Sequence, residues 1–88
     1  MFVGKVIGSI VSTRKNEKLV GSKFMIVESV MDGSKARLVA VDNIGAGIGE
    51  IVLVATGSAA RLCYKLSDAP IDAAIVGIVD DGVGLSGM

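Results

Sequence analysis

The sequence predicts an all-β fold, a small five-stranded barrel with one short helical turn between the fourth and fifth strands. Just over half of the 88 residues (51%) are hydrophobic, chiefly Val, Ile, Leu and Ala, with two Phe, one Tyr and no Trp. The apolar residues form five short runs, and glycines stand between the runs. A chain of this length forms a single domain, residues 1–88, whose core is so small that we expect assembly to add to its stability.

The first apolar run, 2–13, is rich in Val and Ile and is expected to be a strand. Gly4 and Gly8 lie inside it, and glycines at this spacing suit a strand that bends around a small barrel. The charged segment that follows, 13–18, is expected to be an exposed loop.

The second and third strands are expected at 23–30 and 36–41. Between them, the dipeptide Asp32-Gly33 is a strong signal for a hairpin turn. The third strand should therefore run antiparallel to the second.

The fourth strand, 51–55, is short and almost wholly apolar, and we expect it to be buried on both faces. Residues 57–61 follow it and predict one helical turn, with Ser58 as a candidate N-cap. Pro70 then fixes the entry into the fifth strand, 71–80.

Five short strands with glycine corners and one helical turn are typical of a partly open, OB-like barrel. The glycine-rich tail, 81–88, is expected to be flexible. Because barrels of this type often bind oligonucleotides, one functional hypothesis is a binding module for a small ligand or for single-stranded nucleic acid. A formal net charge of zero and scarce aromatic residues argue against a nucleic-acid partner.

The composition also argues against an enzyme. The chain has no His, so the commonest general base and metal ligand is missing. Aspartates near strand ends cap turns more often than they bind metals. Five of its aspartates lie near predicted strand ends: Asp42, Asp68, Asp72, Asp80 and Asp81. We therefore expect no catalytic residue, no cofactor and no metal, with a cation site at Asp80 and Asp81 or a redox role for Cys63 as alternatives.

The location expected from the sequence is the cytoplasm. Cys63 is the single cysteine and has no partner for an internal disulfide, which favours a reducing compartment. The chain shows no signal peptide and no run of about 18 apolar residues, so we expect no membrane partner.

The segment 45–50 reads Gly-Ala-Gly-Ile-Gly-Glu. It superficially resembles a dinucleotide-binding fingerprint, but the glycine spacing differs and no helical pattern follows it. We therefore reject a nucleotide site here.

Taken in order, several motifs make the chain resemble the bacterial microcompartment vertex proteins, the pentamer family of ethanolamine-utilisation, propanediol-utilisation and carboxysome shells. The motifs are Gly4-Lys5-Val6, Val11-Ser12-Thr13, Leu19-x-Gly21-x-Lys23, Val41-Asp42-x-x-Gly45-Ala46-Gly47-x-Gly49-Glu50, Gly57-Ser58-x-Ala60-Arg61 and Asp72-Ala73-Ala74-Ile75-Val76-Gly77-Ile78-Val79-Asp80. The resemblance implies a non-catalytic homopentamer that closes the corners of a polyhedral cytoplasmic shell, beside hexameric facet proteins.

The resemblance also implies roles for particular residues. A narrow central opening is expected at Gly45, Ala46, Gly47, Ile48 and Gly49. Subunit or neighbour contacts are expected at Glu50, Ser58 and Arg61. The alternative is that these glycines only shape a turn within one chain and that Arg61 is a solvated charge.

Two departures from the family pattern concern the type of shell. The connection 31–35 is short where many relatives have a longer excursion, and the long charged C-terminal extension of the carboxysome branch is absent. Both features favour a catabolic microcompartment.

Overall fold

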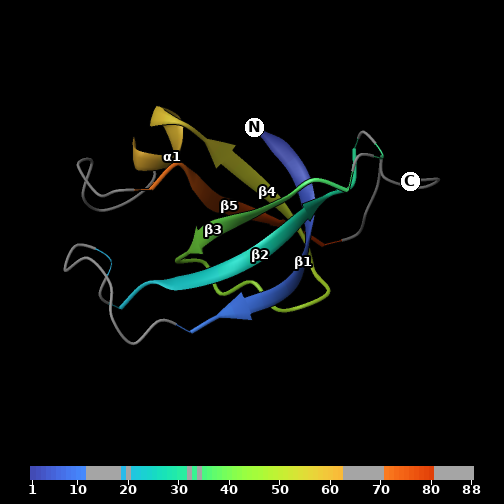
Figure 1. Cartoon of the computed structure of the whole chain (residues 1–88), viewed down its shortest axis with the longest axis horizontal. Coiled ribbons are helices and arrows are strands. Elements are labelled where there is room, and N and C mark those ends of the chain that lie inside the picture. Colours follow the sequence, from blue (N-terminus) through green and yellow to red (C-terminus); the bar gives the residue numbers. More distant parts are fainter. Residues whose placement is uncertain (12–18, 20, 32, 34, 63–70, 81–88) are drawn as a thin grey trace.

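The computed structural model describes residues 1–11, 19, 21–31, 33, 35–62 and 71–80 (Figure 1). Five strands and one helix follow one another in the predicted order, which confirms the predicted fold class. The elements are β1 (Phe2–Ile10), β2 (Lys23–Ser29), β3 (Arg37–Asp42), β4 (Ile51–Thr56), α1 (Ser58–Leu62) and β5 (Ala73–Val79). The predicted loop 13–18, Pro70 and the tail 81–88 lie outside the described residues.

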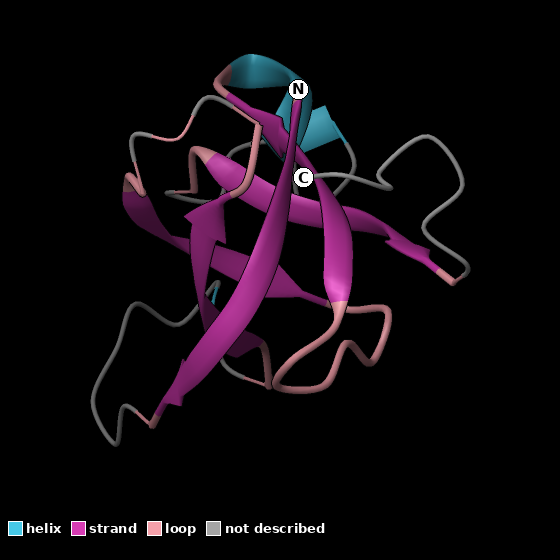
Figure 2. Cartoon of the chain, turned by 90° about the vertical axis from the view of Figure 1, so that its right-hand side faces the viewer, coloured by secondary structure: helices cyan, strands magenta, loops and turns pink. Residues whose placement is uncertain are grey.

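The strands form a closed barrel in the order β1-β2-β3-β5-β4, with β4 paired back to β1 (Figure 2). All pairings are antiparallel except β3 with β5, which is parallel and spans two residue pairs, Val41 with Ala74 and Asp42 with Ile75. This short pairing closes the barrel, so the predicted partly open form is wrong. The strand order itself is that of an OB-like barrel.

The core of the barrel is built from the alternate side chains that point inward. Val6, Val27, Val52 and Val54 are the largest fully buried side chains. Burying each of them contributes about 1.5–3 kcal/mol. The outward residues of β4, Ile51 and Leu53, are only half-buried, so the expectation that this strand is buried on both faces is wrong. In a closed barrel every strand has one inner and one outer face.

The first strand bends as its glycines predicted. A β-bulge lies between Val6 and Gly8, and β1 pairs with β4 only through Phe2–Lys5 before it continues along β2. At Gly4 a Cβ would overlap with the Val27 side chain of the neighbouring strand β2, so β1 needs glycine there.

The connection between β2 and β3 forms the predicted antiparallel hairpin. The backbone N–H of Ser29 donates to the carbonyl of Ala36 at 2.8 Å, and Gly33 has a φ of +71°. Asp32, the other residue of the turn signal, lies outside the described residues.

A second, smaller cluster lies outside the barrel wall. Val41, Ala60, Ile71 and Ala74 are buried together, with Leu19 packed against them. This cluster attaches α1 to the wall. Ile71 belongs to the cluster and not to the fifth strand, where the sequence had placed it.

Candidate functional site

The loop between β3 and β4, residues 43–50, is organised by the last residue of β3. Asp42 is 2% exposed. Its carboxylate accepts backbone hydrogen bonds from the N–H groups of Ile44 (2.9 Å), Gly45 (3.1 Å) and Ala46 (2.8 Å). Aspartate caps turns in this way by bonding to the backbone a few residues ahead. Asp42 therefore acts as the turn cap that was predicted for an aspartate at a strand end.

The second half of the loop is closed by Glu50. Its Oε1 accepts a hydrogen bond from the N–H of Gly47 at 2.5 Å, and its own N–H donates to the Gly47 carbonyl at 3.1 Å. Two further bonds attach the loop to β1: Gly49 N–H to the Val6 carbonyl (2.8 Å) and Val6 N–H to the Glu50 carbonyl (3.0 Å). The conformation of the loop is thus fixed by contacts within one chain.

The glycines of this loop are of two kinds. Gly45 and Gly49 have φ values of +99° and +94°, a region that residues with a side chain rarely adopt. Gly47 is not in that region, and among the described residues a Cβ there would meet the Glu50 side chain alone, 3.2 Å from Oε1. A turn within one chain therefore explains Gly45 and Gly49 but leaves Gly47 unexplained.

The tip of the loop is apolar. Ile44 is 48% and Ile48 is 67% exposed, whereas Ala46 is buried in the main core. The five residues predicted to surround an opening therefore share one loop, but the side chain of Ala46 faces the barrel interior. Because the loop offers exposed apolar side chains on a fixed backbone, its surface suits contact with another protein.

The other predicted contact residues lie at the far end of β4. Glu50 precedes β4, and Ser58 begins α1 just after it, so about 20 Å of strand separates the two. Ser58 is exposed and is the first residue of the helix, one position inside the N-cap predicted for it. Arg61 also belongs to α1. Within one chain, Glu50 in the loop and the predicted contact residues of α1 therefore lie at opposite ends of β4.

The described residues offer little for other chemistry. Among them, no group of three or more His, Cys, Asp or Glu side chains is placed to hold a metal ion. Cys63, Asp68 and Asp81 lie outside the described part of the chain. Within that part, no helix is long and apolar enough to span a membrane.

The sequence reasoning missed how Asp42 organises the whole loop. It placed Asp42 at the end of a strand and treated the glycines separately. The signal was present, because an aspartate followed within a few residues by glycine is typical of a capped turn. The outward-facing apolar residues of the strands were also missed, since the predicted strands were assigned only to a core.

The comparisons with known proteins agree with one another. Residues 1–80 match the family model described as ethanolamine utilisation protein EutN/carboxysome. The chain is 51% identical over 85 residues to GrpN, a bacterial microcompartment shell vertex protein of Rhodospirillum rubrum (strain F11). This alignment covers 91% of this chain and 93% of GrpN. It is 42% identical over 87 residues to the vertex protein PduN of Salmonella typhimurium (strain LT2). That alignment covers 91% of this chain and 96% of PduN.

Solved structures extend this similarity to the fold. The GrpN pentameric microcompartment shell protein superposes with a TM-score of 0.79 at 50% identity, over 91% of this chain and 94% of that one. The pentameric shell protein MSM0273 of the RMM microcompartment superposes with a TM-score of 0.81 at 38% identity, over 92% of each chain.

Proposed function

The chain belongs to the EutN/carboxysome family of shell vertex proteins, and from this we propose that it is a structural, non-catalytic subunit that forms homopentamers and closes the vertices of a microcompartment shell. One observation carries the proposal. The chain and GrpN are 51% identical over nearly the whole length of both.

The shell is proposed to be of the catabolic type and to lie in the cytoplasm. Support comes from GrpN and PduN, both named as vertex proteins of bacterial microcompartments, and from the short connection at 31–35. The neighbours of the vertex are proposed to be hexameric facet proteins, because a sheet of six-fold tiles closes into a polyhedron only where five-fold units interrupt it.

Within the pentamer, we assign the loop at Gly45, Ala46, Gly47, Ile48 and Gly49 to the neighbourhood of the five-fold axis. A loop near an axis is repeated five times in a small space, so it must be fixed and carry small residues. The Asp42 cap and the Glu50 turn supply the first property, and the glycines supply the second. Glu50, Ser58 and Arg61 are proposed to contact a neighbouring subunit.

The experiment that tests this function is shell closure. We would co-express the chain with hexameric facet proteins from the same host and examine the particles by electron microscopy, with and without this chain. Closed polyhedra that require the chain would support the proposal. Particles that are equally closed without it, or that exclude it, would contradict a vertex role even if the purified chain is a pentamer.

A further inference from the structure

The outer surface of the barrel carries two different apolar faces, and we propose that they are the two halves of the ring interface, so that one face of each protomer packs against the other face of the next. The inference rests on the proposed homopentamer and specifies which surfaces build it.

The first face lies on β1, β2 and β3 and is called the β2–β3 face. In register across the strands, Gly8 pairs with Ile26 and Ile26 with Val39, while Ile10 pairs with Phe24. Val39 is 46% and Ile10 is 38% exposed, and Phe24 and Ile26 are half-buried. The intervening residues Met25, Val27 and Ala40 point into the core.

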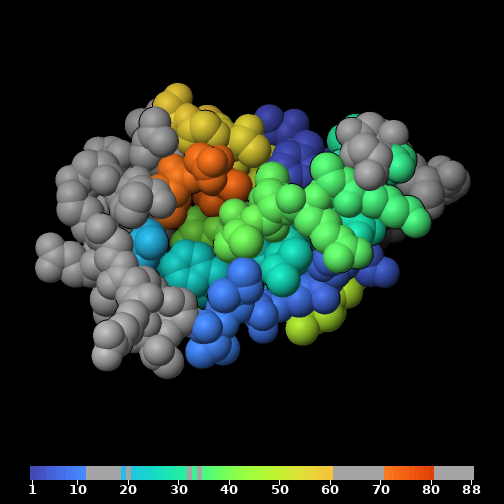
Figure 3. Space-filling model, viewed as in Figure 1, coloured from blue at the N-terminus to red at the C-terminus, as the bar shows by residue number. Residues whose placement is uncertain are grey.

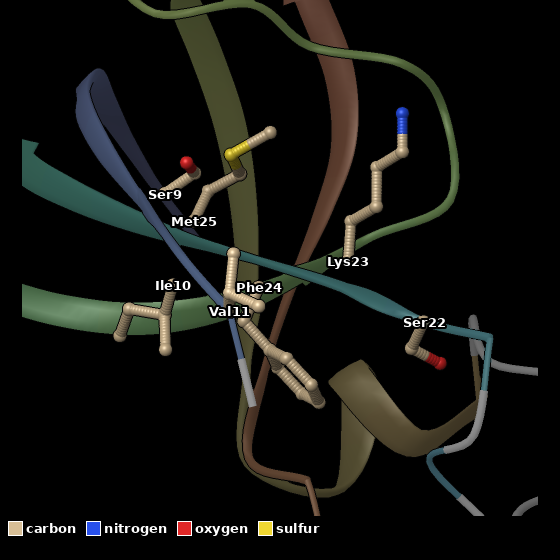
Figure 4. Close-up of a pocket in the computed structure, with 7 residues that line it drawn as sticks. All are labelled: Ser9, Ile10, Val11, Ser22, Lys23, Phe24 and Met25. Carbon is tan, nitrogen blue, oxygen red and sulfur yellow. The ribbon is translucent and has the colours of Figure 1, made fainter. Parts of the chain in front are cut away.

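The figures show how this face is presented. β2 and β3 run across the front of the molecule in Figure 1, and Figure 3 shows their side chains at the surface. In Figure 4, Phe24 lies on one side of β2, and Lys23 and Met25 lie on the other. Ile10, Val11 and Phe24 border a groove with a volume of about 410 Å³, and Val11 is 89% exposed.

The second face lies on β1, β4 and β5 and is called the β4–β5 face. Val3 pairs with Leu53 and Leu53 with Gly77, and in the next row Ile51 pairs with Val79. All five residues are half-buried, while Val52, Val54 and Ile75 point into the core. This face therefore consists of apolar side chains that the barrel does not cover completely.

The two faces differ in sequence and are separated by charge. Lys5, Glu28 and Arg37 lie in register across β1, β2 and β3, next to the Ile26 and Val39 row. Arg37 Nε and Glu28 Oε2 form an ion pair at 2.9 Å. On β1, the strand that both faces share, Lys5 of this charged row lies between Val3 of one face and Gly8 of the other.

A five-membered ring requires this kind of division. A two-fold interface joins a surface to itself, but a ring with an odd number of subunits must join two different surfaces of the same chain. Relatives that are 50% and 38% identical to this chain form pentamers. The occupant of each face is therefore a second copy of this chain, bound through its other face.

Each face has a shallow depression at a glycine, next to a side chain that protrudes from the neighbouring strand. A Cβ on Gly8 would contact Ile26 Cδ1 at 3.6 Å, and a Cβ on Gly77 would contact Leu53 Cδ1 at 3.5 Å. Ile26 and Leu53 therefore stand above a neighbouring strand that has no side chain at that position. Surfaces of this shape can interdigitate, as well-packed interfaces do.

The first test replaces one residue of each face by Asp. Val39→Asp and Leu53→Asp should each raise the concentration needed for the ring by at least about a hundredfold, because each places an unpaired charge in every interface. Met31→Asp is the matched control, since Met31 is 57% exposed but lies outside both faces. Native mass spectrometry measures the oligomer, and circular dichroism shows whether each variant is folded.

The second test keeps the proposal falsifiable if Leu53→Asp fails to fold. In a Cys63→Ser background, a double variant with Val39→Cys and Leu53→Cys should be joined by a short bismaleimide into a ladder that ends at five subunits. Each single-cysteine variant should give no linked dimer. A linked dimer from Val39→Cys alone would mean that the face meets itself, which overturns the proposal.

The outcomes separate this inference from the proposed function. If the wild-type chain is not a pentamer, the proposed function fails first. If the wild type is a pentamer but both Asp variants keep the ring and the double-cysteine variant gives no ladder, the assignment of the two faces is wrong and the vertex function stands. Faces covered instead by another part of the chain or by facet proteins would give this second result.

Discussion

Gly4 and Gly47 belong to two regions of the molecule in which glycine has different neighbours. In the barrel wall, a Cβ on Gly4 would overlap with Val27, so glycine is required by the fold of one chain. In the loop, a Cβ on Gly47 would approach only the flexible carboxylate of Glu50 among the described residues. The fold of one chain therefore explains the glycine at Gly4 but not the one at Gly47, which is consistent with the proposed packing between copies.

Removal of the Asp42 cap, which holds the loop through bonds within one chain, should cost the most stability. Asp42→Ala leaves three backbone N–H groups without their acceptor in a site that is 2% exposed. We expect the free energy of unfolding to fall by about 3 kcal/mol, measured by urea denaturation at one fixed protein concentration. Asp72→Ala removes the same charge from an exposed position and should change stability by less than about 0.5 kcal/mol. Equal losses would mean that the cap does not hold the loop.

Next in size is the substitution that tests the barrel wall. Gly4→Ala should lower the free energy of unfolding by about 2 kcal/mol, because the added methyl group must displace Val27 from the core. In Gly8→Ala the new Cβ makes only an ordinary contact with Ile26 at 3.6 Å, so that variant serves as the control when both variants are measured at a concentration too low for assembly. A tolerated Gly4→Ala would show that β1 can shift and that the wall is less tightly packed than the structure indicates.

Substitution of Gly47 should reduce the stability of the fold only slightly but should strongly weaken assembly. Gly47→Leu should lower the free energy of unfolding by less than about 1 kcal/mol, because the backbone has no positive φ and the neighbouring Glu50 side chain can move. If five copies crowd an axis, the same substitution should abolish the pentamer in light scattering. Loss of fold and assembly in equal measure would instead favour a turn that acts within one chain.

The smallest effect is expected at the turn that Glu50 closes. Glu50→Ala removes one hydrogen bond from an exposed site and should lower the free energy of unfolding by about 0.5 kcal/mol. Glu50→Gln keeps an acceptor for the Gly47 N–H and should retain most of that stability. If Glu50→Gln keeps the fold but weakens the pentamer, the charge of Glu50 acts between subunits.

Most of the fold could be predicted because local patterns determine it. The five apolar runs and the glycines between them gave the order of the elements, and the aspartate-glycine turn signal gave the β2–β3 hairpin. The parallel pairing of Val41 with Ala74 could not be foreseen, since it joins residues far apart in the chain and depends on how the whole barrel closes. For the same reason, the outward exposure of Ile51 and Leu53 was missed.

The candidate site was predicted less completely. The glycine pattern drew attention to residues 45–49, but it did not reveal that Ala46 turns into the core, because that depends on the bonds from Asp42. Ser58 and Arg61 were grouped with Glu50 by family resemblance alone. The structure places them at the other end of β4, where only a contact between copies of the chain could join them to the loop.

If this chain assembles in fives, its oligomeric mass in solution must show it. Native mass spectrometry of the purified wild-type chain, over a series of concentrations, should show a dominant species at five times the 9.0 kDa chain mass. A monomer that stays folded at high micromolar concentration, or an even-numbered assembly with two-fold symmetry, would contradict the account.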